Sequence, residues 1–309
     1  MNWHLIIFIL LISTSVVGQT CCSGGVPLST NLGFVSDDQN TLHLALSGDY
    51  NQLSTLYNED EVLAQNNRKR STSSYFFRVG YDFAHGWATE LLVPFIFQER
   101  SITQNNGLDD LQRSTGIGDV AFLVRKNIFV KPFSLDISAG LKLPTGSTSE
   151  VNNNGLLLVN DMQPGSGSVD GLFLISSTFP IRGSLEMYTT ANYQWKGIDD
   201  DYLGSLSYGF GDELQISSGV SDQVLVGGQI FAPSVGLRYR SRSRDEIDNF
   251  SQENTGGRWM FAQLGVGWLP DQLSSISIKI DVPLWTRIDG TQLSNDYIFN
   301  MTIYRKFKY

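Results

Sequence analysis

Cysteine and histidine are both scarce in this chain of 309 residues. The only two cysteines, Cys21 and Cys22, are adjacent, so a disulfide cannot join them to distant parts of the fold. We interpret them as an exposed pair in a flexible terminus. Lipidation of Cys21 is the alternative, although the residues before it match a lipoprotein cleavage site poorly. Beyond residue 18 the only histidines are His43 and His85, which leaves little material for histidine-based catalysis.

Long apolar runs are also missing, with one short exception. Residues 5–12 are uniformly apolar, and a pattern of small residues ends at Gly18. This predicts a signal peptide over residues 1–18, although its first four residues lack Lys and Arg. No later run approaches the ~18 apolar residues that a spanning helix requires. A transmembrane β-barrel is still allowed, because only alternate residues of its strands face lipid.

The chain has no excess of positive charge. Its formal net charge is −9, and residues 1–18 contain no Asp, Glu, Lys or Arg, so the whole charge lies in residues 19–309. Nucleic acids attract basic surfaces, and we therefore expect no nucleic-acid partner.

A clear period of two is present in residues 297–309. Every second residue is apolar or aromatic, except Arg305, and the opposite face is largely polar. This alternation predicts a strand with water on one side and lipid or core on the other. A closing strand that ends on an aromatic residue resembles the signal by which bacterial outer-membrane barrels are recognised for assembly. We predict Phe307 and Tyr309 as that signal, with the barrel-assembly machinery as a partner.

Similar alternation recurs along the chain. Twelve segments have strand character: 41–50, 73–84, 87–98, 118–127, 133–143, 169–179, 184–196, 206–220, 224–240, 258–268, 274–285 and 297–309. The eighth and ninth are the weakest, because Asp212 interrupts one apolar face and Pro233 requires an edge or a bulge. Long polar connections alternate with short ones such as His85-Gly86.

An even number of strands places all the short connections at one end and the long ones at the other. We therefore predict an all-β fold, a transmembrane antiparallel β-barrel over residues 41–309 with short periplasmic turns and long extracellular loops. Residues 19–40 would form a flexible segment or a plug. A soluble β-sandwich is the alternative, but aromatic residues near the strand ends suit membrane interfaces. The charges on the inward faces also do not suit a dry core.

The faces opposite the apolar ones contain charges of both signs. The candidates for lining the interior are Arg78, Asp82, Glu90, Asp119, Arg125, Asp136, Lys142, Glu186, Lys279 and Asp281. They would either face water or brace the wall as ion pairs.

Four arginines, Arg238, Arg240, Arg242 and Arg244, recur at a spacing of two. On an extended strand they project to one side as a ladder about 20 Å long. One hypothesis is that this ladder lines the outer mouth and favours anionic solutes. The alternative is that it neutralises acidic residues of the following loop or binds lipid phosphates.

Motifs for catalysis and cofactors are weak. Gly165-Ser166-Gly167 lacks the Lys of a phosphate loop, and residues 199–201 (Asp-Asp-Asp) lack the ligand spacing of a calcium loop. No Ser and His are placed together by the sequence as an outer-membrane phospholipase would require, and this enzyme is a remote alternative. We expect no enzyme, cofactor or metal site.

Several short motifs occur together in order. They are residues 81–83 (Tyr-Asp-Phe), 90–94 (Glu-Leu-Leu-Val-Pro), 116–120 (Gly-Ile-Gly-Asp-Val), 142–146 (Lys-Leu-Pro-Thr-Gly), 256–259 (Gly-Gly-Arg-Trp) and 289–293 (Asp-Gly-Thr-Gln-Leu). In this the chain resembles the family of outer-membrane proteins associated with meta-pathway phenol degradation, whose members are described as transporters. The resemblance implies an outer-membrane β-barrel and passage of aromatic or other small organic compounds, and it brings no site residues with it.

These observations predict a barrel in the outer membrane of a Gram-negative bacterium, in contact with outer-membrane lipid and lipopolysaccharide. We expect passive passage of small solutes, aromatic or anionic organic compounds among them. The alternative is a structural or surface-interaction barrel that conducts nothing.

Overall fold

The computed structural model describes residues 39–64, 66–104 and 109–308. The predicted signal peptide, nearly all of the predicted plug segment, both cysteines and Tyr309 lie outside the described residues. Within these residues no helix has the length and apolar character needed to cross a membrane.

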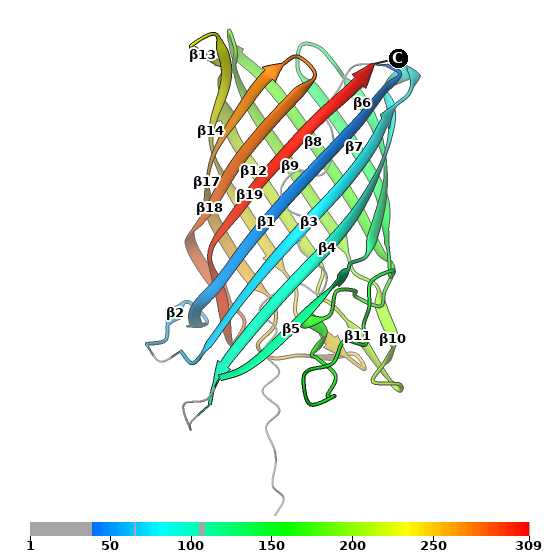
Figure 1. Ribbon diagram of the computed structural model, residues 1–309, viewed down its shortest axis with the longest axis vertical. Helices are drawn as coiled ribbons and strands as arrows, with labels where there is room; N and C mark the ends of the chain where they lie inside the picture. The colour runs from blue at the N-terminus through cyan, green and yellow to red at the C-terminus, as the bar shows by residue number, and fades with distance from the viewer. Residues whose placement is uncertain (1–38, 65, 105–108, 309) are drawn as a thin grey trace, which may run out of the picture.

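The described chain forms a closed antiparallel β-barrel of 12 strands (Figure 1). The strands are β1 (Thr41–Asn58), β3 (Arg68–Asp82), β4 (Trp87–Thr103), β6 (Val120–Phe129), β7 (Ser134–Leu143), β8 (Asp170–Arg182), β9 (Leu185–Trp195), β12 (Glu213–Ser221), β14 (Gln229–Arg242), β17 (Gly257–Asp271), β18 (Ser274–Ile288) and β19 (Thr291–Lys308). Each strand pairs with its neighbour in the chain, and β19 pairs with β1 to close the sheet.

Shorter elements lie at the two ends of the barrel. At the end with longer loops, drawn at the bottom of Figure 1, β5 (Asp109–Ile117) extends the pairing of β4, and β2 (Glu61–Val62) pairs with β1. A separate four-stranded sheet contains β10 (Ile198–Tyr202), β11 (Leu206–Gly209), β15 (Glu246–Ile247) and β16 (Phe250–Ser251). Two 3-10 turns, η1 (Ala84–Gly86) and η2 (Asn160–Met162), and a short strand, β13 (Val224–Val226), complete the elements.

The outer and inner surfaces of the wall differ as the alternation predicted. On β3, Tyr75 and Phe77 are 48% and 49% exposed, whereas Phe76 and Arg78 between and beside them are 4% and 5% exposed. On β19, Phe299 and Ile303 are likewise exposed and Asn300 is buried. An apolar surface this extensive is not stable in water, so the outer wall fits a lipid environment.

The strand count is confirmed, and the boundaries of several strands need correction. The predicted segment 206–220 is divided: its start is β11 in the small outer sheet, and the barrel strand begins at Glu213. Asp212 ends the intervening turn, where its carboxylate accepts hydrogen bonds from Lys196 N at 2.8 Å and from Tyr193 Oη at 2.6 Å. The polar character of Asp212 therefore marks a strand boundary.

The segment 224–240 is also divided, because Gly227 and Gly228 adopt positive φ and turn β13 back onto β14. Pro233 produces no bulge: β14 keeps unbroken register with β17 on one side. On the other side, pairing with β12 ends at Ser234, so Pro233 lies at a local edge.

Two stretches that the sequence predicted as polar loops are partly strand. β1 continues to Asn58 and β3 begins at Arg68, and β5 occupies residues 109–117. In the outer part of β3 and in β5 both faces are largely polar, so the hydrophobic alternation disappears while the backbone pairing continues. In β1 register shifts between Gln52 and Thr55 break the period of two, and Leu53 and Leu56 are both buried.

Candidate functional site

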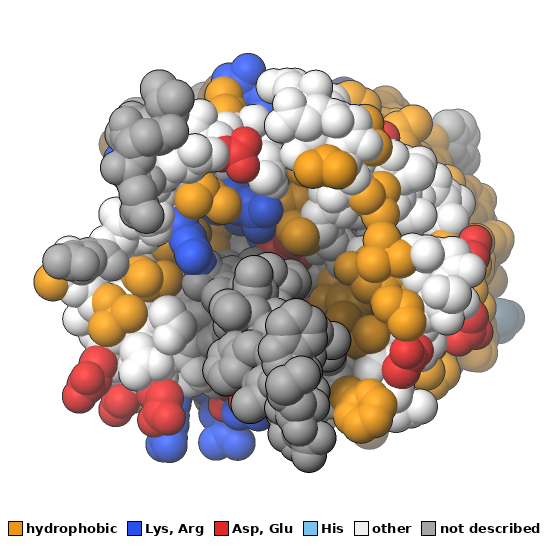
Figure 2. Space-filling view, turned by 90° about the horizontal axis from the view of Figure 1, so that it is seen from below, with side chains coloured by type: hydrophobic (Ala, Val, Ile, Leu, Met, Phe, Trp, Pro, Cys, Tyr) orange, Lys and Arg blue, Asp and Glu red, His pale blue; other side chains and the backbone are white. Residues whose placement is uncertain are grey.

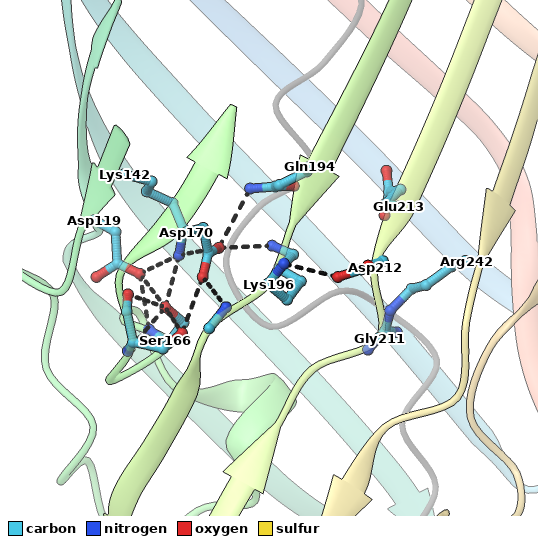
Figure 3. A network of polar contacts seen from close by, with 12 residues as sticks. Asp119, Lys142, Ser166, Asp170, Gln194, Lys196, Gly211, Asp212, Glu213 and Arg242 are labelled. Carbon is cyan, nitrogen blue, oxygen red and sulfur yellow. Dashed lines mark hydrogen bonds and ion pairs between the residues drawn. The ribbon is translucent and has the colours of Figure 1, made fainter. Parts of the chain in front are cut away.

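The connection between β7 and β8, residues 144–169, turns toward the barrel interior, and we call it the inward loop. Its exposed first half is followed by buried residues, among them Leu158 and Met162, which are 3% and 0% exposed. This loop and the charged side chains around it form the candidate site, drawn in part in Figure 3.

Asp119 anchors both ends of the inward loop. It lies in the short break between β5 and β6 and is 3% exposed. Its carboxylate accepts hydrogen bonds from Gly146 N at 3.0 Å, Ser166 N at 2.9 Å and Ser166 Oγ at 2.7 Å. The Lys142 ammonium, at 2.6 Å, neutralises it. One carboxylate thus joins the start of the loop, its end and the wall.

The charges continue along the wall from Lys142 (Figure 3). Asp170 Oδ2 lies 3.0 Å from Lys142 Nζ and 3.1 Å from Lys196 Nζ, so two ammonium groups share it. Asp170 also accepts a hydrogen bond from Gly197 N at 3.1 Å. Lys196 lies past the end of β9, and burial lowers its pKa to about 8 against the opposing attraction of Asp170.

Two glycines allow the inward loop to double back. A Cβ on Gly165 would lie 2.3 Å from the Gly146 carbonyl oxygen, and one on Gly146 would lie 2.6 Å from Gly165 Cα. Real Cβ atoms do not come this close to backbone, so both positions require glycine. The motifs 116–120 and 142–146, on which the family resemblance is based, are therefore packed against residues 165 and 166 of the inward loop.

The centre of the inward loop, at η2, is held by a residue from the barrel wall. Arg70 of β3 donates to the Asp161 carboxylate at 2.5 Å and to the Asp161 carbonyl and the Gln98 side chain. Gln98 in turn donates to the Gln163 carbonyl at 3.3 Å. Charge-assisted bonds of this kind are among the strongest that a buried loop can make.

Three members of the arginine ladder, Arg238, Arg240 and Arg242, lie on β14 and are buried, and Arg244 follows the end of that strand. Arg238 pairs with Asp281 at 2.9 Å, Arg240 with Glu213 at 2.8 Å, and Arg242 with Asp245. Each of the three is therefore matched by a carboxylate. Arg244 lies apart from them: it is partly exposed and lies 3.4 Å from Asp289.

Aromatic rings lie against the same guanidinium groups. Arg238 stacks over Phe261 at 4.6 Å and Arg240 over Trp259 at 5.0 Å, distances that suit cation–π contact. Trp259 and Phe261 are 4% and 0% exposed and belong to an inward apolar cluster with Ile288. A further inward cluster comprises Phe76, Leu92, Ala121, Leu123, Leu172 and Leu174.

The outer end of the ladder is joined to the small sheet. Tyr208 of β11 donates to Asp245 at 2.8 Å, and Asp245 also accepts from Gly211 N at 2.9 Å. Burial and the neighbouring carboxylate raise the pKa of Tyr208, so its hydroxyl keeps the proton that it donates. Seen from the long-loop end, basic side chains lie within the hollow of the barrel (Figure 2).

A second charged cluster lies at the short-turn end. Asp82 of β3 accepts from Arg125 of β6 at 2.6 Å and lies 3.0 Å from Nε2 of His43. His43 Nδ1 is 2.6 Å from Tyr304 Oη, and Arg125 lies 3.9 Å from Asp136. Arg78 and Glu90 face each other nearby at 3.7 Å. A cavity of about 320 Å³ borders this cluster and is lined in part by Asp82, Arg125, Trp87 and Ile128.

The structure thus brings most of the candidate interior residues into two clusters, one at each end. Glu186 and Lys279 are half-buried and belong to neither. Sequence reasoning missed Arg70, Asp161, Asp170, Lys196 and Glu213. Asp170 and Glu213 begin barrel strands and lie within the predicted segments 169–179 and 206–220, and their place opposite the outward apolar residues was the available signal. Asp161 lies in a stretch without strand alternation, so no sequence pattern identified it as a site residue.

The described part of the chain contains no group of three or more His, Cys, Asp or Glu side chains that could hold a metal ion. No known family model matches the sequence. No curated protein matches it either.

Similarity appears instead among solved structures. The chain superimposes on an outer membrane channel from Pseudomonas putida F1 with a TM-score of 0.73 and 12% sequence identity, covering 90% of this chain and 100% of that one. The β-domain of a Bordetella autotransporter gives a TM-score of 0.52 at 10% identity, over 86% and 99% of the two chains. The fold is therefore that of an outer-membrane β-barrel, as the family resemblance implied.

Proposed function

We propose that this protein is an outer-membrane channel for the passive passage of small aromatic compounds. The apolar outer wall places the strands in lipid, the short turns then face the periplasm and the longer loops face the exterior. The similar channel from Pseudomonas putida F1 supports this assignment through its fold.

The observation that carries the proposal is the stacking of paired arginines on inward-facing rings. Arg238 and Arg240 lie over Phe261 and Trp259, next to apolar side chains that also point inward. Both rings and both guanidinium groups are buried in this structure, so a flat aromatic solute would stack on them only as these side chains move apart, and its polar substituent would then meet the surrounding charged groups. An interior of this composition suits an aromatic solute better than a sugar.

The charge balance argues against a strong preference for anions. Each buried ladder arginine is matched by its own carboxylate. Among the buried side chains of the described residues, carboxylates slightly outnumber Lys and Arg. Selectivity for anions needs uncompensated positive charge along the path, and the ladder does not supply it.

Uptake into proteoliposomes tests the proposal. Benzyl alcohol, benzoate and arabinose would be compared as probes for the wild type and for the variant Trp259→Ala with Phe261→Ala. We expect the wild type to admit benzyl alcohol faster than arabinose, and the variant to lose that preference. Tyr75→Ala, which removes an exposed ring from the outer wall, is the matched control.

A barrel that admits none of the three probes, although it shifts with heat on gels as a folded barrel does, would support the structural alternative. Faster entry of benzoate than of benzyl alcohol would restore the anion hypothesis.

A further inference from the structure

Two arginines on the outer wall face each other without a carboxylate between them. Arg258 of β17 and Arg287 of β18 are direct cross-strand partners, and both side chains are exposed. Like charges directly opposite one another in a sheet are destabilising. Neither arginine forms an ion pair with any residue that the structure describes.

Elsewhere in the sheet, arginines at comparable cross-strand positions have a carboxylate partner. At the corresponding outward position of β4 and β5, Glu99 faces Arg113, and the two bridge at 2.8 Å. Inside the barrel, Arg70 also faces an arginine, Arg100, and there the inward loop brings the carboxylate of Asp161 to Arg70. In both places an anion accompanies the arginine.

Other charges near the outer pair leave it positive. Asp289 follows Arg287 closely in sequence, but its carboxylate lies 3.4 Å from Arg244. The backbone of Glu59 accepts a hydrogen bond from Ile288 N at 2.9 Å, and its side chain is exposed to solvent. On the other side of Arg258 the cross-strand partner is Ser241, which carries no charge.

The position of the two arginines along the barrel axis indicates where a compensating anion would come from. The next paired positions on the same face toward the middle of the barrel are Met260 and Trp285, and Trp285 is 45% exposed. Farther along β17, Leu264 and Val266 are exposed as well. Exposed tryptophan at the limit of an apolar wall marks the membrane interface, so the arginines lie at the level of the outer-leaflet head groups.

We propose that Arg258 and Arg287 form a binding site for a phosphate group of an outer-leaflet glycolipid. Two guanidinium groups offer forked donors that match the oxygens of a phosphate monoester, and the bound charge removes their mutual repulsion. The lipid chains then lie along the apolar wall below. The site rests on the membrane placement in the proposed function, and it does not depend on which solute passes.

Lipid binding to the full-length folded protein in detergent tests the site. Native mass spectrometry would compare diphosphoryl lipid A, the same lipid with its phosphates removed, and inorganic phosphate. For the double variant Arg258→Ser and Arg287→Ser we expect at least tenfold weaker binding of diphosphoryl lipid A. Arg113→Ser is the matched control, because this exposed arginine already has Glu99 as its partner, and its binding should equal that of the wild type.

Three results would overturn the assignment: equal binding by the double variant and the wild type, equal binding of the dephosphorylated lipid, or binding of inorganic phosphate without preference for lipid A. The last would assign the arginines to a free anion. Gel mobility with and without heating confirms that each variant is folded. Aromatic uptake by the double variant should be unchanged, so a failure of this site and a failure of the proposed channel are separate outcomes.

Discussion

The two charged clusters inside the barrel join different parts of the structure. At the short-turn end, Asp82 joins His43 and Arg125, and all three residues lie on barrel strands. At the long-loop end, Asp119 and Asp170 join the wall to the two ends of the inward loop. The first cluster braces strands against strands, whereas the second fixes a connecting loop inside the barrel. Similar chemistry therefore joins strand to strand at one end and loop to wall at the other.

The largest expected loss of stability comes from disrupting the charged cluster around Asp82. Asp82→Ala leaves Arg125 without its 2.6 Å partner and removes the carboxylate beside His43, both of them buried. Removing one member of a buried ion pair costs about 3–5 kcal/mol. Unfolding in urea, followed by heat-shifted gel mobility, measures the loss. Single-channel conductance of the folded fraction should stay unchanged, and an altered conductance would contradict the division between the two ends.

The exposed Glu99–Arg113 pair also supplies a control for the stability measurements. Glu99→Ala removes an exposed partner of Arg113 and should change the free energy of unfolding by no more than about 1 kcal/mol. A loss as large as that of Asp82→Ala would show that position inside the barrel does not matter.

The second effect comes from releasing the inward loop. Asp119→Ala removes the acceptor shared by Gly146 N, Ser166 N and Ser166 Oγ, while Lys142 keeps Asp170 as a partner. We expect a loss of about 3 kcal/mol, at the lower limit for a buried pair because Lys142 remains neutralised. Planar-bilayer recording should show higher and noisier conductance. Ser149→Ala, in the exposed half of the loop, is the control, and an unchanged current in Asp119→Ala would remove the loop from the conduction path.

A smaller effect is expected from crowding the loop where it doubles back. Gly165→Ala places a methyl group 2.3 Å from the Gly146 carbonyl oxygen, so the two segments must separate. Overpacking of this kind costs about 1–3 kcal/mol. Gly155→Ala, at a turn with open space around it, is the comparison, and its cost arises only from positive φ. Conductance of Gly165→Ala should change in the same direction as that of Asp119→Ala.

The last expected effect is a dependence of stability on pH. The pKa of Lys196 is about 8 in the folded barrel, below its ordinary value of 10.5. The unfolded chain therefore holds this proton over a window in which the folded chain has lost it, and stability rises with pH between these values. The gain is at most ~1.4 kcal/mol per pH unit. Lys196→Met should lack it, so the free energy of unfolding of the wild type, measured in urea, should rise relative to that of the variant from pH 8 to pH 10. Parallel curves would contradict the assignment.

The sequence predicted the wall well because one face of every strand meets an apolar medium. Alternation such as that of Phe299, Asn300, Met301 and Thr302 was sufficient to assign strand, face and number. It was insufficient where both faces are largely polar, so the outer part of β3 and all of β5 were missed as strands. It also failed in the outer part of β1, where register shifts interrupt the period of two. The turn at His85-Gly86 was placed correctly, and both residues adopt the positive φ that such a turn requires.

The candidate site was predicted only in part, for a similar reason. Arg238, Arg240 and Arg242 could be placed on one face from their spacing, but their partners Asp281, Glu213 and Asp245 come from other segments. The contact of Arg70 with Asp161 joins residues 91 positions apart. Such contacts depend on how a long loop folds back, and no local pattern encodes that path. Sequence spacing left open whether the ladder is uncompensated or is neutralised by acidic residues of the following loop. The structure shows a neutralised ladder, in which Asp245 of that loop pairs with Arg242 and the other two carboxylates come from barrel strands.

The pairing of β1 with β19 also governs how the barrel is made. Thr41 lies opposite Lys308, so the seam that closes the wall joins residues from the two ends of the described chain. Such distant contacts carry the full entropic cost of closing a long loop and are slow to form. Every other strand pair joins segments much closer in sequence. The open sheet would therefore be expected to precede the cylinder, with two unpaired edges exposed until the last strand arrives. Closure of the seam is then the step that a folding catalyst can most usefully accelerate.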